Sequence, residues 1–167
     1  MTRQILPNPS PSRGRELREG ELIRLSGPDE TEALGRRLAP SLRPGDVVAL
    51  YGDLGAGKTT LARGMLRGLG FEGDVASPTF PIVQPYEDLA PPLWHVDLYR
   101  IEDPAEIEEL ALDEALEAGA LVIEWPERLG GALWPEALRL TLARDGDGAR
   151  ALTAIVPPAW EGRWPPR

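Results

Sequence analysis

The chain has 167 residues, of which 42% are hydrophobic and 27% are charged, a composition typical of a globular protein with one hydrophobic core. It contains no cysteine, so disulfides and thiolate chemistry are excluded and a cytoplasmic location is expected. The net charge of −9 argues against direct binding of DNA or tRNA, and no apolar run is long enough to predict a membrane span.

The two ends of the chain differ in composition from its middle. Residues 1–19 are rich in Pro, Ser and Arg and contain no apolar segment, so we predict a flexible tail there. A single domain is expected over residues 20–157. It is followed by a C-terminal tail over residues 158–167, where Trp160 and Trp164 are expected to be exposed in Pro-rich sequence.

Predicted strands and helices alternate through the domain. The expected elements are a strand at 21–25, a helix at 29–39, a buried strand at 46–51, a helix at 60–69, a Pro-rich loop and edge strand within 74–87, a buried strand at 93–99, an acidic helix at 103–118, a buried strand at 120–125 and a β-hairpin over 138–143 and 149–156. The acidic helix is interpreted as a solvated face; the alternative is a docking surface for a basic partner. This order predicts an α/β protein with a mainly parallel sheet and a C-terminal antiparallel hairpin.

A glycine-rich loop joins the buried strand at 46–51 to the next helix. Residues 52–59 read GDLGAGKT and match the pattern GxxxxGK[ST], in which backbone N–H groups surround phosphates. Lys58 is the only lysine of the chain, and the Thr59 hydroxyl can ligate Mg²⁺. We therefore predict a nucleoside triphosphate and Mg²⁺ as cofactors and a three-layer P-loop NTPase-like fold. The predicted nucleotide-binding residues of this segment are Asp53, Leu54, Gly55, Ala56, Gly57, Lys58, Thr59 and Thr60.

Two acids stand where predicted buried strands end. Asp97 and Glu124 each interrupt an apolar run. Burying a carboxylate at the end of such a strand costs folding free energy unless the carboxylate is paired or binds a metal. Both are therefore candidates for catalysis and for Mg²⁺ binding; the alternative for Asp97 is an ion pair with Arg100. His95 is the only histidine and is interpreted as a packed or hydrogen-bonded residue, while Trp125 is expected to border the site.

Four segments together resemble a known family. GDLGAGKTT is followed by SPTF at residues 77–80, HVDLYR at 95–100 and EWP at 124–126. This order resembles the TsaE (YjeE) family, the small P-loop ATPases of bacterial tRNA threonylcarbamoyladenosine biosynthesis, over about residues 22–156. The resemblance implies an ATPase that is weak alone and that supports TsaB and TsaD in forming N6-threonylcarbamoyladenosine at position 37 of tRNAs reading codons that begin with A.

The resemblance also implies roles for individual residues. Lys58 and Thr59 would bind phosphate and Mg²⁺, and Thr79 would be a switch threonine that senses the γ-phosphate. Asp97 and Glu124 would share Mg²⁺ binding and the positioning of water. Residues 26–31, Thr31 among them, would lie near the nucleotide base. The family pattern also suggests a glycine near position 111, where this chain has Ala111.

Two other functions remain open after these motifs, and a third is excluded. A GTPase would need an NKxD motif, which a chain with Lys58 as its only lysine and Asn8 as its only asparagine cannot contain. A small-molecule P-loop kinase would transfer phosphate to a metabolite instead of to water. A nucleotide-loaded regulatory subunit would bind ATP tightly and hardly hydrolyse it.

Overall fold

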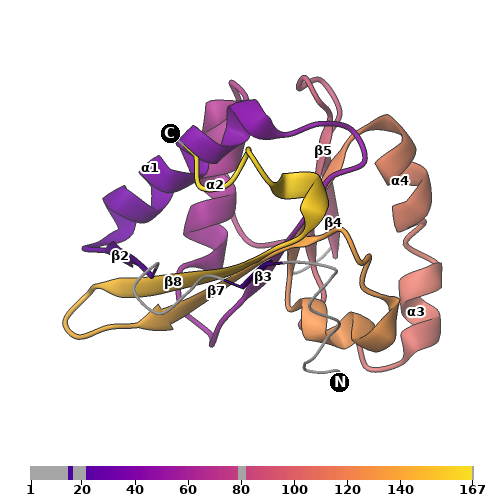
Figure 1. Ribbon diagram of the computed structural model, residues 1–167. Coiled ribbons are helices and arrows are strands. Elements are labelled where there is room, and N and C mark those ends of the chain that lie inside the picture. Colours follow the sequence, from indigo (N-terminus) through magenta and orange to yellow (C-terminus); the bar gives the residue numbers. More distant parts are fainter. Residues whose placement is uncertain (1–14, 17–21, 79–81, 167) are drawn as a thin grey trace.

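An eight-stranded sheet forms the middle of the molecule, with helices on both of its faces (Figure 1). The computed structural model describes residues 15–16, 22–78 and 82–166. The elements in chain order are β1 (Arg15–Glu16), β2 (Ile23–Leu25), α1 (Pro28–Leu38), the 3-10 helix η2 (Ala39–Ser41), β3 (Val47–Tyr51), α2 (Lys58–Gly68), β4 (Val83–Tyr86), β5 (Leu93–Asp97), α3 (Pro104–Glu108), α4 (Leu112–Ala118), β6 (Ala120–Glu124), η3 (Pro126–Ala132), β7 (Leu138–Arg144), β8 (Arg150–Val156) and η4 (Pro158–Trp160).

The centre of the sheet is parallel and its margins are antiparallel. Strand order is β1-β8-β7-β3-β6-β5-β4, with β2 also paired to β8. Strand β3 runs parallel to β6 and β7, and β5 runs parallel to β6. The antiparallel pairs are β4 with β5 and β8 with β7, β1 and β2. The predicted fold class and the C-terminal hairpin are therefore confirmed, and Pro-containing β4 is an edge strand as expected.

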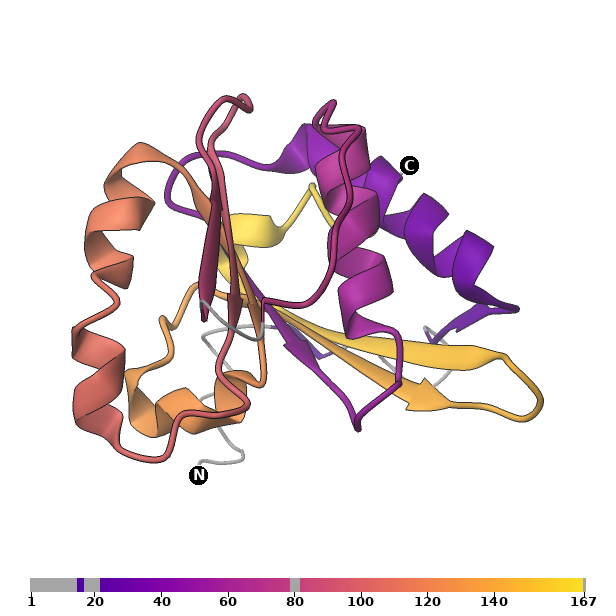
Figure 2. The ribbon, with the colours of Figure 1, turned by 180° about the vertical axis from the view of Figure 1, so that it is seen from behind.

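The sheet separates two hydrophobic cores. Helices α1 and α2 cover one face, and α3, α4 and η3 lie on the other (Figure 2). In β3, Val48 and Leu50 belong to the core beneath α1 and α2, whereas Val47 belongs to the opposite core, because successive strand side chains point to opposite faces. This alternation buries β3 on both faces from Val47 to Leu50 and gives the loop that follows the strand a rigid support.

Two facing helices hold the segment that follows the glycine-rich loop. A Cβ atom at Gly64 of α2 would lie 2.1 Å from the Glu32 carbonyl oxygen of α1, and one at Gly35 of α1 would lie 2.4 Å from the Leu61 carbonyl oxygen. Only glycine allows the two backbones to approach this closely. Close packing against α1 at Leu61 and Gly64 thus holds α2 in place, and with it the N-terminus of the helix.

The acidic segment after β5 departs from its prediction. The single helix expected at 103–118 is wrong: α3 and α4 are separate, and Ala111 between them has φ 54°. A left-handed residue cannot continue a right-handed helix. Position 111 is also the place where the family pattern suggests glycine, the residue that adopts this conformation at least cost.

The C-terminal segment also differs from expectation. The prediction that Trp160 and Trp164 are exposed is wrong, since both side chains are buried in the core beneath α1 and α2. Arg163 stacks on the Trp160 ring at 3.9 Å and bonds Asp46 through Nη1 at 2.7 Å. Asp46 is distant in the sequence, so composition does not reveal this contact. At the other end, β1 (Arg15–Glu16) lies within the predicted N-terminal tail and pairs with β8. The other residues of 1–19 lie outside the described part of the chain.

Among the described residues, no helix is long and apolar enough to cross a membrane.

Candidate nucleotide-binding and catalytic site

The glycine-rich loop lies between the end of β3 and the start of α2. Gly52 has φ 144° and Gly57, which precedes the first turn of α2, has φ 110°. Residues with a Cβ atom rarely adopt these angles. A Cβ at Gly52 would also lie 2.6 Å from the Leu142 carbonyl oxygen. The glycines of the motif therefore let the loop turn tightly against β7 and direct α2 with its N-terminus toward the site.

Lys58 is held inside this loop. Its Nζ donates hydrogen bonds to the carbonyl oxygens of Gly52 at 2.5 Å and Asp53 at 3.0 Å and lies 4.3 Å from the centroid of the Trp125 ring. Burial lowers the pKa of Lys58, and the nearby carboxylates, above all that of Glu124, oppose this shift. Neutral carbonyls only partly compensate a buried ammonium, so an anion beside Lys58 would be favoured.

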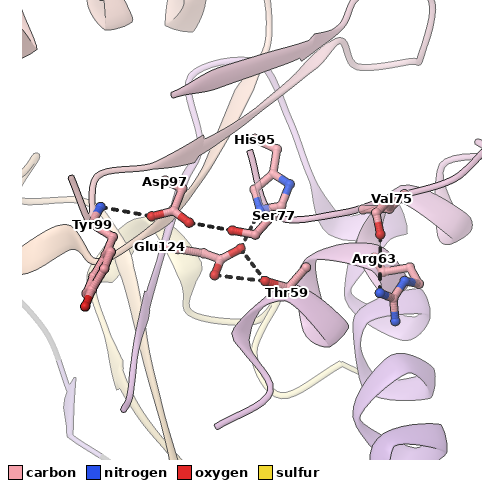
Figure 3. Close-up of polar contacts among 8 residues, drawn as sticks. All are labelled: Thr59, Arg63, Val75, Ser77, His95, Asp97, Tyr99 and Glu124. Carbon is pink, nitrogen blue, oxygen red and sulfur yellow. Dashed lines mark hydrogen bonds and ion pairs between the residues drawn. The ribbon is translucent and has the colours of Figure 1, made fainter. Parts of the chain in front are cut away.

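The two predicted acids are neighbours across the sheet. Asp97 at the end of β5 lies directly opposite Glu124 at the end of β6 in the parallel register. Glu124 is 3% exposed and accepts hydrogen bonds from the Thr59 hydroxyl at 3.1 and 3.0 Å (Figure 3). Asp97 accepts hydrogen bonds from the Ser77 hydroxyl and from the Tyr99 backbone N–H, the latter at 2.9 Å. Each carboxylate therefore has its own donors.

His95 completes the contacts of Glu124. Its Nε2 lies 2.7 Å from Glu124 Oε2, and the ring is fully buried (Figure 3). Within the described residues its Nδ1 has no hydrogen-bond partner, so the contact with Glu124 is the one that orients the ring. The interpretation of His95 as a hydrogen-bonded residue is confirmed. Its link to Glu124 was not predicted, although strand alternation places positions 95 and 97 on the same face.

A cavity of about 400 Å³ opens between the loop and the two acids. The predicted site residues that line it are Leu54, Gly55, Gly57, Lys58, Thr59, Thr60, Asp97, Glu124 and Trp125. Ser77, Pro78, Tyr99 and Arg100 also line it. These four residues belong to the segments 77–80 and 95–100 that carry the family resemblance, but no binding or catalytic role was predicted for them, because a motif does not show which of its side chains face a cavity. The hydrogen bond from Arg63 on α2 to the Val75 carbonyl oxygen fixes the segment before Ser77 (Figure 3).

The four other predicted residues differ in their outcome. Thr31 is buried in α1 and donates its hydroxyl to the Gly27 carbonyl oxygen at 3.3 Å. Ala56 is buried, and it and Asp53 do not belong to the cavity lining. Thr79 lies outside the described residues. A base-binding role for Thr31 and a switch role for Thr79 stay predictions.

The donor set suits Mg²⁺ held jointly with phosphates. The Thr59 hydroxyl and the carboxylates of Asp97 and Glu124 supply hard oxygen atoms to one cavity. Mg²⁺ is usually bound by one or two carboxylates together with substrate phosphates. Residues 22–78 and 82–166 contain no cluster of three His, Cys, Asp or Glu side chains that could hold a metal alone, so the phosphates would have to complete the coordination.

Comparisons with known proteins identify the family and the fold that the chain is similar to. Residues 25–152 match the family model described as threonylcarbamoyl adenosine biosynthesis protein TsaE. The chain is 44% identical to the tRNA threonylcarbamoyladenosine biosynthesis protein TsaE of Bacillus subtilis, covering 78% of this chain and 82% of that protein. It is 46% identical to the protein of the same name from Streptomyces coelicolor, covering 78% and 91%. The crystal structure of Bacillus subtilis YdiB superposes with a TM-score of 0.75 at 34% identity, covering 90% and 92%.

Proposed function

The chain belongs to the TsaE family of threonylcarbamoyl adenosine biosynthesis proteins, and we propose that it is a Mg²⁺-dependent ATPase of tRNA threonylcarbamoyladenosine biosynthesis. In this proposal it supports TsaB and TsaD as they form N6-threonylcarbamoyladenosine at position 37 of tRNAs reading codons that begin with A, and it acts in the cytoplasm. The observation that carries the proposal is the placement of Lys58, Thr59, Asp97 and Glu124 around one cavity.

The loop binds the ATP phosphates in this mechanism. Backbone N–H groups of residues 52–59 and the positive end of the α2 dipole face the anion. Lys58 moves its ammonium from the Gly52 and Asp53 carbonyl oxygens onto the phosphates, because charged oxygens are stronger acceptors than neutral carbonyls. Trp125 lies against this ammonium and closes the cavity on that side.

The acids carry the hydrolytic step. Thr59, Asp97 and Glu124 would hold Mg²⁺, which when bound neutralises developing charge on the phosphate oxygens. Glu124 orients water for in-line attack, and His95 and Thr59 fix its carboxylate for that task. Thr79 would sense the γ-phosphate. Because the work is positioning and charge stabilisation, no covalent intermediate on the protein is needed.

In this proposal the chain hydrolyses ATP weakly alone, and partners raise its turnover and make the contact with RNA. The loop supplies Lys58 as its only cation, and an arginine contributed or ordered by a partner would raise the rate by stabilising transition-state charge. The net charge of −9 disfavours a direct tRNA interface. The names of the relatives place them in tRNA threonylcarbamoyladenosine biosynthesis, so we assign tRNA contact to TsaB and TsaD.

The test is Mg²⁺-dependent ATP hydrolysis by the purified chain, with and without TsaB and TsaD, using Lys58→Ala as the blank. Stimulation by the pair that is absent in the blank supports the proposal. High turnover that the pair does not change would refute the partner-dependent part. Phosphate transfer to an added metabolite instead of water would favour the kinase alternative.

A further inference from the structure

Two arginines of the C-terminal hairpin bind the carbonyl oxygens of the glycine-rich loop. Arg150 donates from Nε to the Ala56 carbonyl oxygen at 2.8 Å and from Nη2 to that of Gly55 at 3.1 Å. Arg144 donates from Nη2 to the Leu54 carbonyl oxygen at 3.4 Å. Three consecutive carbonyl groups of the loop are thus bound by side chains from another part of the chain, and Arg150 binds two of them as a fork.

The hairpin itself does not benefit from this placement. Arg144 and Arg150 lie directly opposite each other in the antiparallel register, and like charges in that position destabilise a strand pair. A Cβ atom at Gly55 would lie 2.8 Å from Arg144 Nη2, so the loop leaves room for the guanidinium. A locally unfavourable pair that fits a neighbouring loop is expected where it serves a function.

The carbonyl contacts set the direction of the loop's N–H groups. In a planar trans peptide, the carbonyl of one residue and the N–H of the next point to opposite sides. Holding the Leu54 and Ala56 carbonyl groups on the hairpin arginines therefore turns the N–H groups of Gly55 and Gly57 away from the hairpin. Both glycines line the cavity. A cation on the carbonyl also polarises the peptide and strengthens the opposite N–H as a donor.

We propose that Arg150, assisted by Arg144, is a positioning residue that braces the glycine-rich loop and so directs the Gly55 and Gly57 N–H groups at the nucleotide phosphates. This inference rests on the proposed function for the identity of the anion. Arg150 acts through the loop backbone, so its contribution belongs to nucleotide affinity more than to the hydrolytic step. The fork needs a guanidinium, because Arg150 reaches the two carbonyl oxygens from two different nitrogens of one rigid plane, whereas a lysine would have to reach both from a single nitrogen.

The first experiment compares the Kd of ATP and of ADP for the wild type, Arg150→Ala, Arg150→Lys and Arg24→Ala. Arg24 is the matched control, since its guanidinium bonds Asp145 at the same hairpin at 3.2 Å and its removal changes the net charge equally. Arg150→Ala is expected to weaken both nucleotides about tenfold, with kcat at saturating ATP nearly unchanged. Arg150→Lys should recover only part of the loss, and Arg24→Ala should bind like the wild type.

Three results would contradict the proposed role of Arg150: a wild-type nucleotide Kd in Arg150→Ala, a wild-type Kd in Arg150→Lys, or a loss of nucleotide affinity in Arg24→Ala equal to that in Arg150→Ala. A second measurement needs no nucleotide. The Ala56 N–H shares its peptide with the Gly55 carbonyl that Arg150 binds, and it donates to the Asp53 carbonyl oxygen at 3.0 Å. Hydrogen exchange at the Ala56 amide should be faster in Arg150→Ala and Arg150→Lys than in Arg24→Ala, while β3 amides keep their protection. Unchanged exchange at Ala56 also contradicts the proposed role of Arg150. Absence of ATP binding by the wild type would instead refute the proposed function, and the exchange result would still decide the brace.

Discussion

The site consists of two halves that are built in different ways. In the loop half, residues 52–59 with Arg150, cationic side chains bind main-chain carbonyl oxygens: Lys58 binds those of Gly52 and Asp53, and Arg150 those of Gly55 and Ala56. In the acid half, Asp97 and Glu124 with Ser77 and His95, most contacts join side chains on different elements.

This difference predicts different sensitivities. A loop that presents backbone N–H groups spreads its binding over many peptides, so losing one side chain weakens it without removing it. The position of a buried carboxylate such as that of Glu124 depends on a few hydrogen-bond donors. Removing one of them leaves a buried polar group without a partner, which costs free energy. We therefore expect changes in the loop half to act mainly on nucleotide affinity and changes in the acid half mainly on turnover.

The largest effect is expected from Glu124→Gln. The amide keeps the size of the side chain but cannot orient water as a carboxylate does, so kcat should fall at least about hundredfold. The Kd of ATP measured with EDTA should change by no more than about twofold, because the loop is untouched and no Mg²⁺ is bound. Single-turnover hydrolysis and equilibrium ATP binding measure the two quantities. If Glu124→Gln supports tRNA modification fully, hydrolysis is dispensable and the regulatory-subunit alternative replaces the ATPase.

Thr59 connects the two halves, because its hydroxyl donates a hydrogen bond to the Glu124 carboxylate. Thr59→Val keeps the shape and removes the hydroxyl, so the gain in ATP affinity that Mg²⁺ provides should drop about tenfold. Affinity measured with EDTA should stay at the wild-type value. Titrations of ATP with and without Mg²⁺ test this, with Thr153→Val on β8 as the control. An equal loss with and without Mg²⁺ would show that Thr59 serves the loop alone.

The two halves were also predictable to different degrees. The loop could be predicted because its function depends on consecutive residues between a buried strand and a helix. Asp97 and Glu124 could be predicted as strand-end acids, but their partners Ser77 and His95 depend on strand register and on a loop position that spacing does not give. The burial of Trp160 rests on Arg163 and on the core beneath α1, contacts that only the folded chain reveals.

A smaller effect is expected at His95, which tests whether the acid half needs orientation beyond Thr59. In His95→Leu the Glu124 carboxylate loses the donor at 2.7 Å, and kcat should fall about tenfold with little change in the Kd of ATP. His95→Gln retains a side-chain donor and should recover most of the rate. Equal losses in both variants, or a rise in Kd that matches the fall in kcat, would mean that His95 serves packing and not the placement of Glu124.

The smallest effect is expected from Ala111→Gly, which tests whether the acid half is independent of the helices α3 and α4 on the face of the sheet opposite α1 and α2. Ala111 has φ 54° between them, where glycine is free of the penalty that a Cβ atom carries. Ala111→Gly should therefore raise the free energy of unfolding by about 1 kcal/mol. The same replacement within α4, Ala115→Gly, should lower it by about 1 kcal/mol. Urea unfolding measures both, and ATP turnover should stay at the wild-type rate in Ala111→Gly. A change in kcat in Ala111→Gly would show that the positions of Asp97 and Glu124 depend on how α3 and α4 pack against β5 and β6. The acid half of the site would then include contacts on that face of the sheet.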